Sequence, residues 1–219
     1  MESSVGGQQH DSAVAYVSKS LELVAERIPA DHAEMRHYYN AAYLVNLSAG
    51  NHQSALEYAE KNLEIRKRYF SDRPAYVKLG YAAMSSAYNA MGNFEQGLGN
   101  QKISYELALE AFGMDNPSTG LDAANLAFSY YRVEDFEKAL IYQQQALDVF
   151  AKTYKPNHFL VVRGNIRMGI FHLARFEITK SREYRDKATL LLEQIDPENR
   201  RDLPEMLNDL NSEITAFEK

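Results

Sequence analysis

The fold is decided by residues 125–147, which read NLAFSYYRVEDFEKALIYQQQAL, because their pattern returns along the whole chain. Two places in this stretch, the small residue Ala139 and the aromatic Tyr142, recur at a step of 42 residues. The small place is filled by Ala13, Ala55, Gly97, Ala139 and Ser181, and the aromatic place by Tyr16, Tyr58, Asn100, Tyr142 and Tyr184. A fixed period of this length predicts an architecture of stacked repeats.

Each repeat is predicted to contain two helices joined by a tight turn. In the repeat that begins at Pro74, one helical pattern ends at Gly92-Asn93 and a second continues to about Phe112. Proline at a helix start and glycine just past a helix end are the expected punctuation. No alternation typical of strands interrupts the series. We therefore predict an all-α fold of about ten helices in stacked antiparallel pairs.

The period also sets the predicted boundaries along the chain. The first residues, 1–10, are polar, contain Gly6-Gly7 and are expected to form a disordered lead-in. The repeats are predicted to occupy residues 11–199, as a half-unit at 11–31 and full units at 32–73, 74–115, 116–157 and 158–199. Residues 200–219 match only the first helix of a unit, and their polar, acidic composition suits a C-terminal capping helix.

Composition and motifs exclude several function classes. The net charge is −6, so the basic footprint of a nucleic-acid binder is missing. No apolar run approaches the roughly 20 residues of a membrane span. The chain has no cysteine, and its six histidines form no HExxH pair. We therefore expect no nucleic acid, membrane, metal or cofactor as a partner, no catalytic residue, and a cytoplasmic location.

The repeat resembles the tetratricopeptide repeat. The residues that carry the resemblance are Asn125-Leu126-Ala127, Tyr130, Glu134-Asp135-Phe136, Ala139 and Ala146-Leu147, in the order small, aromatic, turn, aromatic, small. The period of 42 exceeds the family's usual value of about 34. This period is similar to that of the kinesin light chain type of repeat. In that type the units are joined by a Gly-x-Asp-His-Pro linker, which the segment Gly113-Met114-Asp115-Asn116-Pro117 resembles. The resemblance covers about residues 11–214 and implies a right-handed superhelical α-solenoid.

In such arrays the first helix of each unit lines a concave groove, and here the two helix types differ in charge. The four predicted first helices contain only two acidic residues, Glu34 and Asp122. They contain six basic residues, which are Arg36, Lys78, Arg132, Arg163, Arg167 and Arg175. A near-neutral to basic groove in an acidic protein favours a neutral or anionic partner. The alternative is that first helices carry few charges because they are buried.

The resemblance also implies which side chains face the groove. Except for Arg167, which is chosen as a basic residue that could meet an acidic partner, they share one set of offsets in each first helix, and together they combine polar handles with aromatic and aliphatic anchors. These candidate binding residues are His37, Asn40, Leu44, Leu79, Ser86, Asn89, Phe128, Tyr131, Arg132, Arg163, Ile166, Arg167 and Ile170. The alternative for each apolar member is that it packs on the next repeat.

Three functions are consistent with the sequence. The first is a non-catalytic scaffold whose groove binds a protein or peptide segment of neutral-to-acidic, amphiphilic character. The second is a small-molecule-binding or catalytic protein with an apolar pocket, in which Tyr88, Tyr130, Tyr131 and His172 supply acid–base groups. The third is a self-associating module, a homo-oligomer formed through the open half-units at the two ends.

Overall fold

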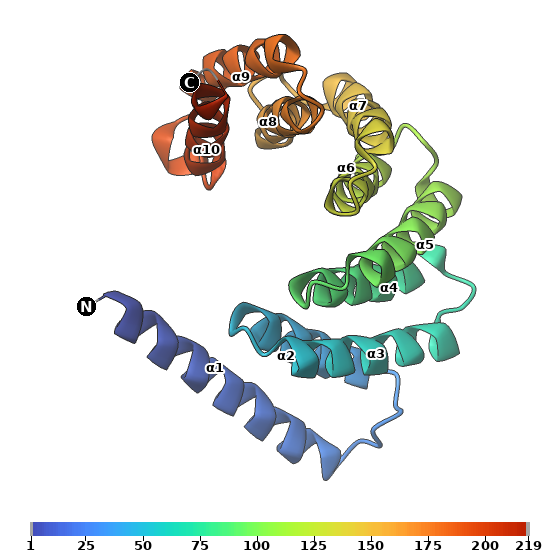
Figure 1. Cartoon of the computed structure of the whole chain (residues 1–219). Coiled ribbons are helices and arrows are strands. Elements are labelled where there is room, and N and C mark those ends of the chain that lie inside the picture. Colours follow the sequence, from blue (N-terminus) through green and yellow to red (C-terminus); the bar gives the residue numbers. More distant parts are fainter. Residues whose placement is uncertain (1, 218–219) are drawn as a thin grey trace. The chain divides into compact units, whose positions relative to one another are not determined.

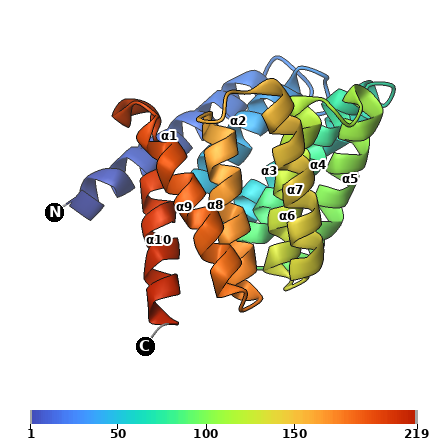
Figure 2. The ribbon, with the colours of Figure 1, turned by 90° about the horizontal axis from the view of Figure 1, so that it is seen from above.

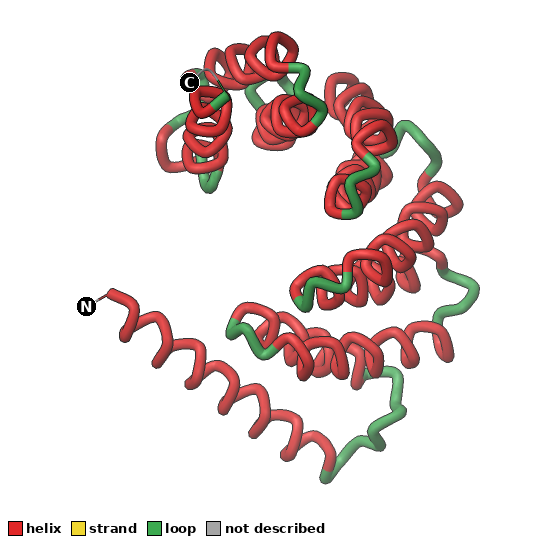
Figure 3. Tube along the Cα trace, viewed as in Figure 1, coloured by secondary structure: helices red, strands yellow, loops and turns green. Residues whose placement is uncertain are grey.

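The structure is a computed structural model that describes the backbone of residues 2–217 and the side chains of residues 11–217. Within these residues it contains ten α-helices, one short 3-10 helix and no strand (Figure 3). Within each of its two compact units, consecutive helices run antiparallel and pack in sequential pairs (Figures 1 and 2). The predicted all-α architecture is thus confirmed. The chain divides into two compact units, Met1–Ala111 and Phe112–Lys219, which are described separately.

The first unit contains a single helix followed by two helix pairs. The helices are α1 (Glu2–Ala25), α2 (Met35–Ser48), α3 (His52–Tyr69), α4 (Pro74–Ala90) and α5 (Phe94–Phe112), the last ending one residue beyond the unit. The pairs α2–α3 and α4–α5 fall where the period predicts them. Helix α1 begins at Glu2, so the backbone of residues 2–10 is helical, whereas the sequence led us to expect a disordered lead-in.

The second unit contains two helix pairs followed by a single helix. The helices are α6 (Pro117–Arg132), α7 (Phe136–Thr153), α8 (Phe159–Ala174), α9 (Ile178–Glu193) and α10 (Leu203–Ala216), with a 3-10 turn at Pro197–Asn199. Helix α10 buries Leu203, Leu207, Leu210 and Ile214 in one cluster with residues of α8 and α9. Its remaining surface carries mostly polar and acidic side chains, as expected for a cap.

The small residue that recurs every 42 positions is buried in each of the four helix pairs. Ala55, Ala139 and Ser181 are fully buried. At the equivalent Gly97, a Cβ atom would collide with the side-chain amide of Asn89 on α4. Since a larger side chain at this place would separate the two helices, the small residue sets the spacing of the pair.

Each helix pair is closed by a turn whose central residue has left-handed backbone dihedrals. These residues lie 42 apart: Gly50 and Gly92 at φ 79°, Glu134 at φ 61° and Phe176 at φ 60°. The amide that follows each of them reaches back to the carbonyl five residues earlier, as in Asn93 N to Tyr88 O at 2.9 Å. This is the bond that characterises a Schellman turn. Glycine accepts the conformation without steric cost, whereas glutamate and phenylalanine do not.

The linkers between pairs also repeat their polar contacts. The side chains of His32, Asn116 and His158, spaced by multiples of 42, each accept a hydrogen bond from a backbone amide two residues later, at 3.2, 2.8 and 3.3 Å. His158 and Asn116 thereby cap the N-termini of α8 and α6. The linker histidines therefore have a structural role.

A second set of linker contacts joins residues 37 apart. Arg68 Nη1 lies 2.6 Å from Asp31 Oδ2, and Lys152 Nζ lies 2.6 Å from Asp115 Oδ1. In the next repeat the acid is replaced by Asn157, whose amide donates to the carbonyl of Gln194 at 3.0 Å. The contact is kept there, but its negative charge is lost.

The strained turns predict where glycine stabilises this fold. Replacing Glu134 by glycine should raise the free energy of unfolding by about 1 kcal/mol, because it removes a non-glycine residue from the left-handed region. Gly92→Ala should lower it by a similar amount. Chemical denaturation measures both changes. Glu183→Gly, in the middle of α9, serves as the control and should destabilise. Equal destabilisation by Glu134→Gly and Glu183→Gly would contradict the assignment.

The turn after α8 predicts a pH dependence of stability. Glu177 lies 2.7 Å from His172 Nδ1, 3.2 Å from Arg175 and 3.3 Å from Lys180. These contacts, led by the one with His172, lower the pKa of Glu177. A carboxyl whose pKa is lowered by folding stabilises the folded state above its unfolded pKa of about 4.3, and that stabilisation is lost as the pH falls through the folded pKa.

Glu177→Gln should therefore be less stable than the parent protein at pH 7, and the difference should shrink toward zero near pH 3. Urea denaturation at a series of pH values measures it. Glu183→Gln, an exposed change on the same helix, should show no such trend. A Glu177→Gln deficit that stays constant from pH 7 to pH 3 would disagree with this account.

Candidate functional site

The predicted binding residues lie on the first helices of the pairs, which are α2 and α4 in the first unit and α6 and α8 in the second. In the first unit α2 and α4 are in contact. Leu44 on α2 and Leu79 on α4 are 50% and 48% exposed, and His37 and Ser86 are also exposed. The first unit therefore presents accessible leucines beside polar groups.

Two further candidates in the first unit, Asn40 and Asn89, are half-buried. The amide of Asn89 lies against Gly97, and its Nδ2 is 3.5 Å from the hydroxyl of Ser85. Its Oδ1 has no hydrogen-bond partner among the described residues. Asn89 thus contributes to the closure of the α4–α5 pair, which leaves only part of its side chain for a partner.

In the second unit the structure brings four of the predicted residues together. Phe128, Tyr131 and Arg132 come from α6 and Arg167 comes from α8; we call them the aromatic–arginine cluster. The guanidinium of Arg167 lies 5.1 Å from the ring centre of Phe128, and that of Arg132 lies 5.8 Å from it. The rings of Phe128 and Tyr131 stack with centres 6.0 Å apart. All four side chains are half-buried, so each keeps some accessible surface.

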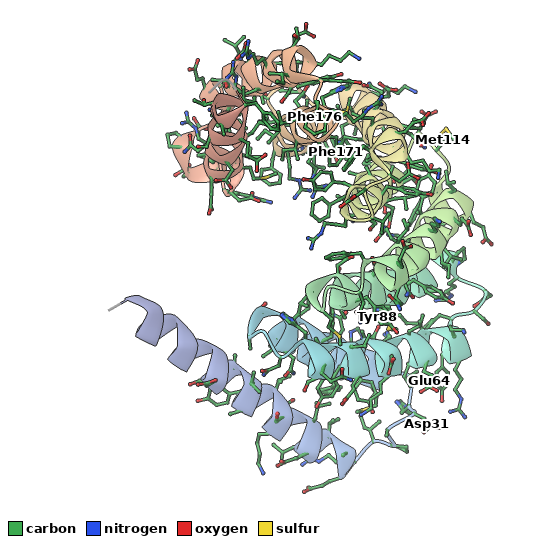
Figure 4. The ribbon with its side chains drawn as sticks, in the orientation of Figure 1. Asp31, Glu64, Tyr88, Met114, Phe171 and Phe176 are labelled. Carbon is green, nitrogen blue, oxygen red and sulfur yellow. The ribbon has the colours of Figure 1, made fainter. Side chains whose placement is uncertain are left out.

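Packing beneath the cluster fixes its geometry. Tyr131 stacks at 5.0 Å on Phe171, which is fully buried in α8 (Figure 4). Arg167 Nη1 donates to the carbonyl of Ala124 on α6 at 3.2 Å. The cluster is thus held from below by a buried ring and from the side by a backbone carbonyl, and a site held in this way is preorganised.

Arg167 carries a charge that the described residues do not neutralise. No carboxylate among them lies within 4 Å of its guanidinium. Burial, together with repulsion from Arg163, lowers the pKa of Arg167 to about 10, although attraction to Asp202 acts in the opposite direction. At neutral pH the group therefore remains protonated. A partly desolvated cation beside aromatic rings attracts an anionic group strongly.

Arg163 lies one helical turn before Arg167 and meets an arginine that the sequence analysis missed. The guanidinium groups of Arg163 and Arg201 lie 4.9 Å and 4.6 Å from the ring centre of the same residue, Phe159. Burial lowers the pKa of Arg163; Asp202 opposes the shift and Arg201 adds to it. Arg201 was missed because it lies in a linker, outside the helical periodicity that selected the other candidates.

Two candidates from α8 differ in their accessibility. Ile166 is 0% exposed and belongs to the core cluster of α8, α9 and α10, so we remove it from the candidate site. The helical offset placed Ile166 toward the groove, but its long aliphatic side chain packs in the core with residues of α9 and α10. Ile170 is half-buried and lines a pocket of about 240 Å³ with Tyr131, Phe176 and Phe217. Burial and the nearby Glu213 raise the pKa of Tyr131.

The residues considered for acid–base chemistry are explained by packing. Tyr130 stacks on Tyr142 at 5.4 Å, and His172 stacks on Tyr184 at 5.3 Å, each pair joining the two helices of one repeat. Tyr130 and His172 lie 42 residues apart and are both buried. Tyr88, at the same place in α4, packs on the core cluster of α2, α3 and α4 (Figure 4).

Helix α1 exposes apolar side chains whose counterparts in other repeats are covered. Tyr16 is 78% exposed and Leu23 is 52% exposed. Ile65 and Val149, which occupy the place of Leu23 in later repeats, are only 4% and 3% exposed.

Among the described residues, no group of three or more histidine, aspartate or glutamate side chains could hold a metal ion. No helix in residues 2–217 is both long and apolar enough to cross a membrane.

Comparison with known proteins supports the repeat assignment. Residues 80–152 match the sequence model of the tetratricopeptide repeat. BtubC (BKLC) from P. vanneervenii superposes with a TM-score of 0.76 at 13% identity, over 95% of this chain and 85% of that chain. A Podosopora anserina protein with nearly identical TPR-like repeats, assigned to the kinesin light chains, gives a TM-score of 0.73 at 16% identity. The match covers 85% of this chain and 89% of that chain.

The apo form of RapI gives a TM-score of 0.73 at 13% identity, with 95% of this chain matching 60% of RapI. No curated protein matches the sequence. At these identities the structural likeness is one of fold. The resemblance inferred from residues 125–147 is confirmed for residues 80–152, which match the tetratricopeptide repeat, and the chain shares the fold of kinesin light chain-like repeat structures. Arrays of this repeat typically mediate protein–protein binding.

Proposed function

We propose that this chain, whose residues 80–152 carry the tetratricopeptide repeat, is a non-catalytic scaffold that binds a protein or peptide segment on its first helices. The observation that carries the proposal is the aromatic–arginine cluster of the second unit. It offers the ring surfaces of Phe128 and Tyr131 directly beside the unneutralised guanidinium of Arg167. Aromatic and arginine side chains of this kind are the usual anchors of a binding interface.

The chemistry of the cluster supports a partner that combines acidic and apolar side chains. An acidic side chain would meet Arg167 or Arg132, and an apolar side chain next to it would cover the ring of Phe128. In the first unit, the exposed Leu44 and Leu79 favour an aliphatic contact beside the polar His37 and Ser86. A neutral-to-acidic amphiphilic segment would suit either surface taken by itself. Since the pKa of Arg167 is about 10, its charge is available throughout the neutral range.

Selection from a displayed peptide library supplies a ligand to test this proposal. We expect the enriched sequences to combine an acidic residue with an aromatic or large aliphatic residue. Arg167→Gln and Phe128→Ala should each weaken the affinity of such a peptide by about tenfold, equivalent to about 1.4 kcal/mol. Isothermal titration calorimetry measures the change. Lys187→Gln, an exposed change on α9, is the matched control and should have no effect.

Circular dichroism of each variant separates lost binding from lost folding. If a selected peptide binds both folded variants as tightly as it binds the parent protein, the cluster is not the site.

A second candidate function, self-association, is favoured by the exposed face of α1. Tyr16 and Leu23 together present apolar surface that a second chain could cover. Analytical ultracentrifugation over a range of concentrations should then show a dimer or larger species. Tyr16→Glu with Leu23→Glu should return the protein to a monomer. A parent protein that is monomeric at every concentration would eliminate this function.

A further inference from the structure

A pocket of about 500 Å³ lies in the second unit where the α7–α8 linker meets the α9–α10 linker. We call it the linker pocket. Its walls include the aromatic rings of Tyr154 and Phe159 and the side chain of Ile195, its cationic groups are Lys155 and Arg201, and His158 also lines it. No aspartate or glutamate is among the described residues that line it. Its volume is within the range of small-molecule sites.

The place held by Asn157 is acidic in two of the three earlier linkers and is Arg73 in the other. At the equivalent place in earlier linkers, Asp31 and Asp115 form ion pairs with Arg68 and Lys152. In the linker pocket that place is held by Asn157, which keeps a hydrogen bond to the carbonyl of Gln194 but carries no charge. The repeat therefore tolerates a carboxylate at this place, and only this linker combines a neutral residue with a cationic pocket.

The cations around the pocket are concentrated and unpaired. Arg201 and Arg163 both lie within 5 Å of the ring centre of Phe159, and no carboxylate of the described residues is within 4 Å of either guanidinium. The acids of the same linker, Asp196, Glu198 and Asp202, lie outside the pocket lining. Arg163 is not among the residues that line the pocket, so Arg201 and Lys155 are the cations that an anion in the pocket would meet.

The backbone of Arg201 is strained. Its φ is 52°, in the left-handed region that favours glycine. Residues held in this region tend to gather at ligand sites, where the surrounding structure compensates for the strain. In this case the strained residue directs its guanidinium onto the Phe159 ring and into the pocket lining.

His158 supplies a further donor. Its Nδ1 accepts a hydrogen bond from the amide of Leu160 at 3.3 Å, so the proton of the neutral ring is assigned to Nε2. Its ring stacks on Tyr154 with centres 3.9 Å apart, which fixes its orientation. Burial and the nearby Arg201 lower the pKa of His158, so the ring is neutral at pH 7.5 and offers one hydrogen-bond donor.

We propose that the linker pocket binds a small organic phosphate monoester, with the phosphoryl oxygens on Arg201 and Lys155 and the organic group against Tyr154, Phe159 and Ile195. A phosphoryl dianion matches the surplus of cations, and a guanidinium binds its oxygens in bidentate fashion. The apolar walls and the volume exceed what a bare inorganic ion would fill. This site is separate from the aromatic–arginine cluster and does not depend on the peptide-binding function.

Phenyl phosphate, phenyl sulfate and inorganic phosphate are suitable probes, titrated at pH 7.5 with calorimetry and with the NMR signals of the His158 ring. Phenyl phosphate should bind about tenfold more tightly than inorganic phosphate, because its ring buries apolar surface. It should also bind several-fold more tightly than phenyl sulfate, which has the same shape and one charge less. If phenyl phosphate does not saturate the protein by about 10 mM, its affinity is negligible and the proposal is overturned.

Two variants test the residues. Arg201→Gly removes the guanidinium and relieves the backbone strain, so the protein should remain folded while its affinity for phenyl phosphate falls at least about tenfold. Asn157→Asp restores the acid found in earlier linkers and should weaken binding by a similar factor. Lys152→Gln changes a cation outside the pocket and should have no effect. Unchanged affinity in both folded variants would also overturn the proposal.

The two sites can be told apart in the same proteins. Arg201→Gly should leave binding of the selected peptide unchanged, and Arg167→Gln should leave binding of phenyl phosphate largely intact. Loss of both ligands in Arg201→Gly would mean that the linker pocket is not an independent site.

Discussion

The close approach of two helices at one small residue is the constraint on which the rest of the structure depends. Ala55, Ala139 and Ser181 are fully buried, and Gly97 has no room for a Cβ atom. This spacing lets an aromatic residue of one helix stack on the other, as Tyr130 does on Tyr142. The same spacing recurs at a step of 42 residues, so the linkers, caps and turns of successive pairs can be compared residue by residue.

Most of the architecture could be predicted because the residues that start and end helices fall at the places that the 42-residue period indicates. Pro74, Pro117 and Gly92 mark helix ends where the structure has them. The left-handed turns at Glu134 and Phe176 could be located only by counting 42 residues from Gly92, since neither residue type signals such a backbone. The helical state of residues 2–10 was not expected, because their polar composition contains no apolar periodicity.

The candidate site was only partly predictable. Helical offsets selected Phe128 and Tyr131, the excess of basic residues on first helices selected Arg167, and these side chains do lie together. The same offsets selected Ile166, which is in the core, because an offset specifies a direction on a helix and not what packs against it. Arg201 lies in a linker and not on a helix, so no helical offset could select it. Its place depends on how two linkers meet, and that information is contained in the tertiary structure alone.

The uneven chemistry of the turns has a consequence for local unfolding. In a repeat protein each pair is stabilised mainly by its neighbours, so strain in one turn is not shared through a common core. The α6–α7 and α8–α9 pairs are closed by Glu134 and Phe176, whereas α2–α3 and α4–α5 are closed by glycine. Turn chemistry therefore gives the helix pairs unequal opening free energies, and amide hydrogen exchange would resolve them as separate cooperative segments.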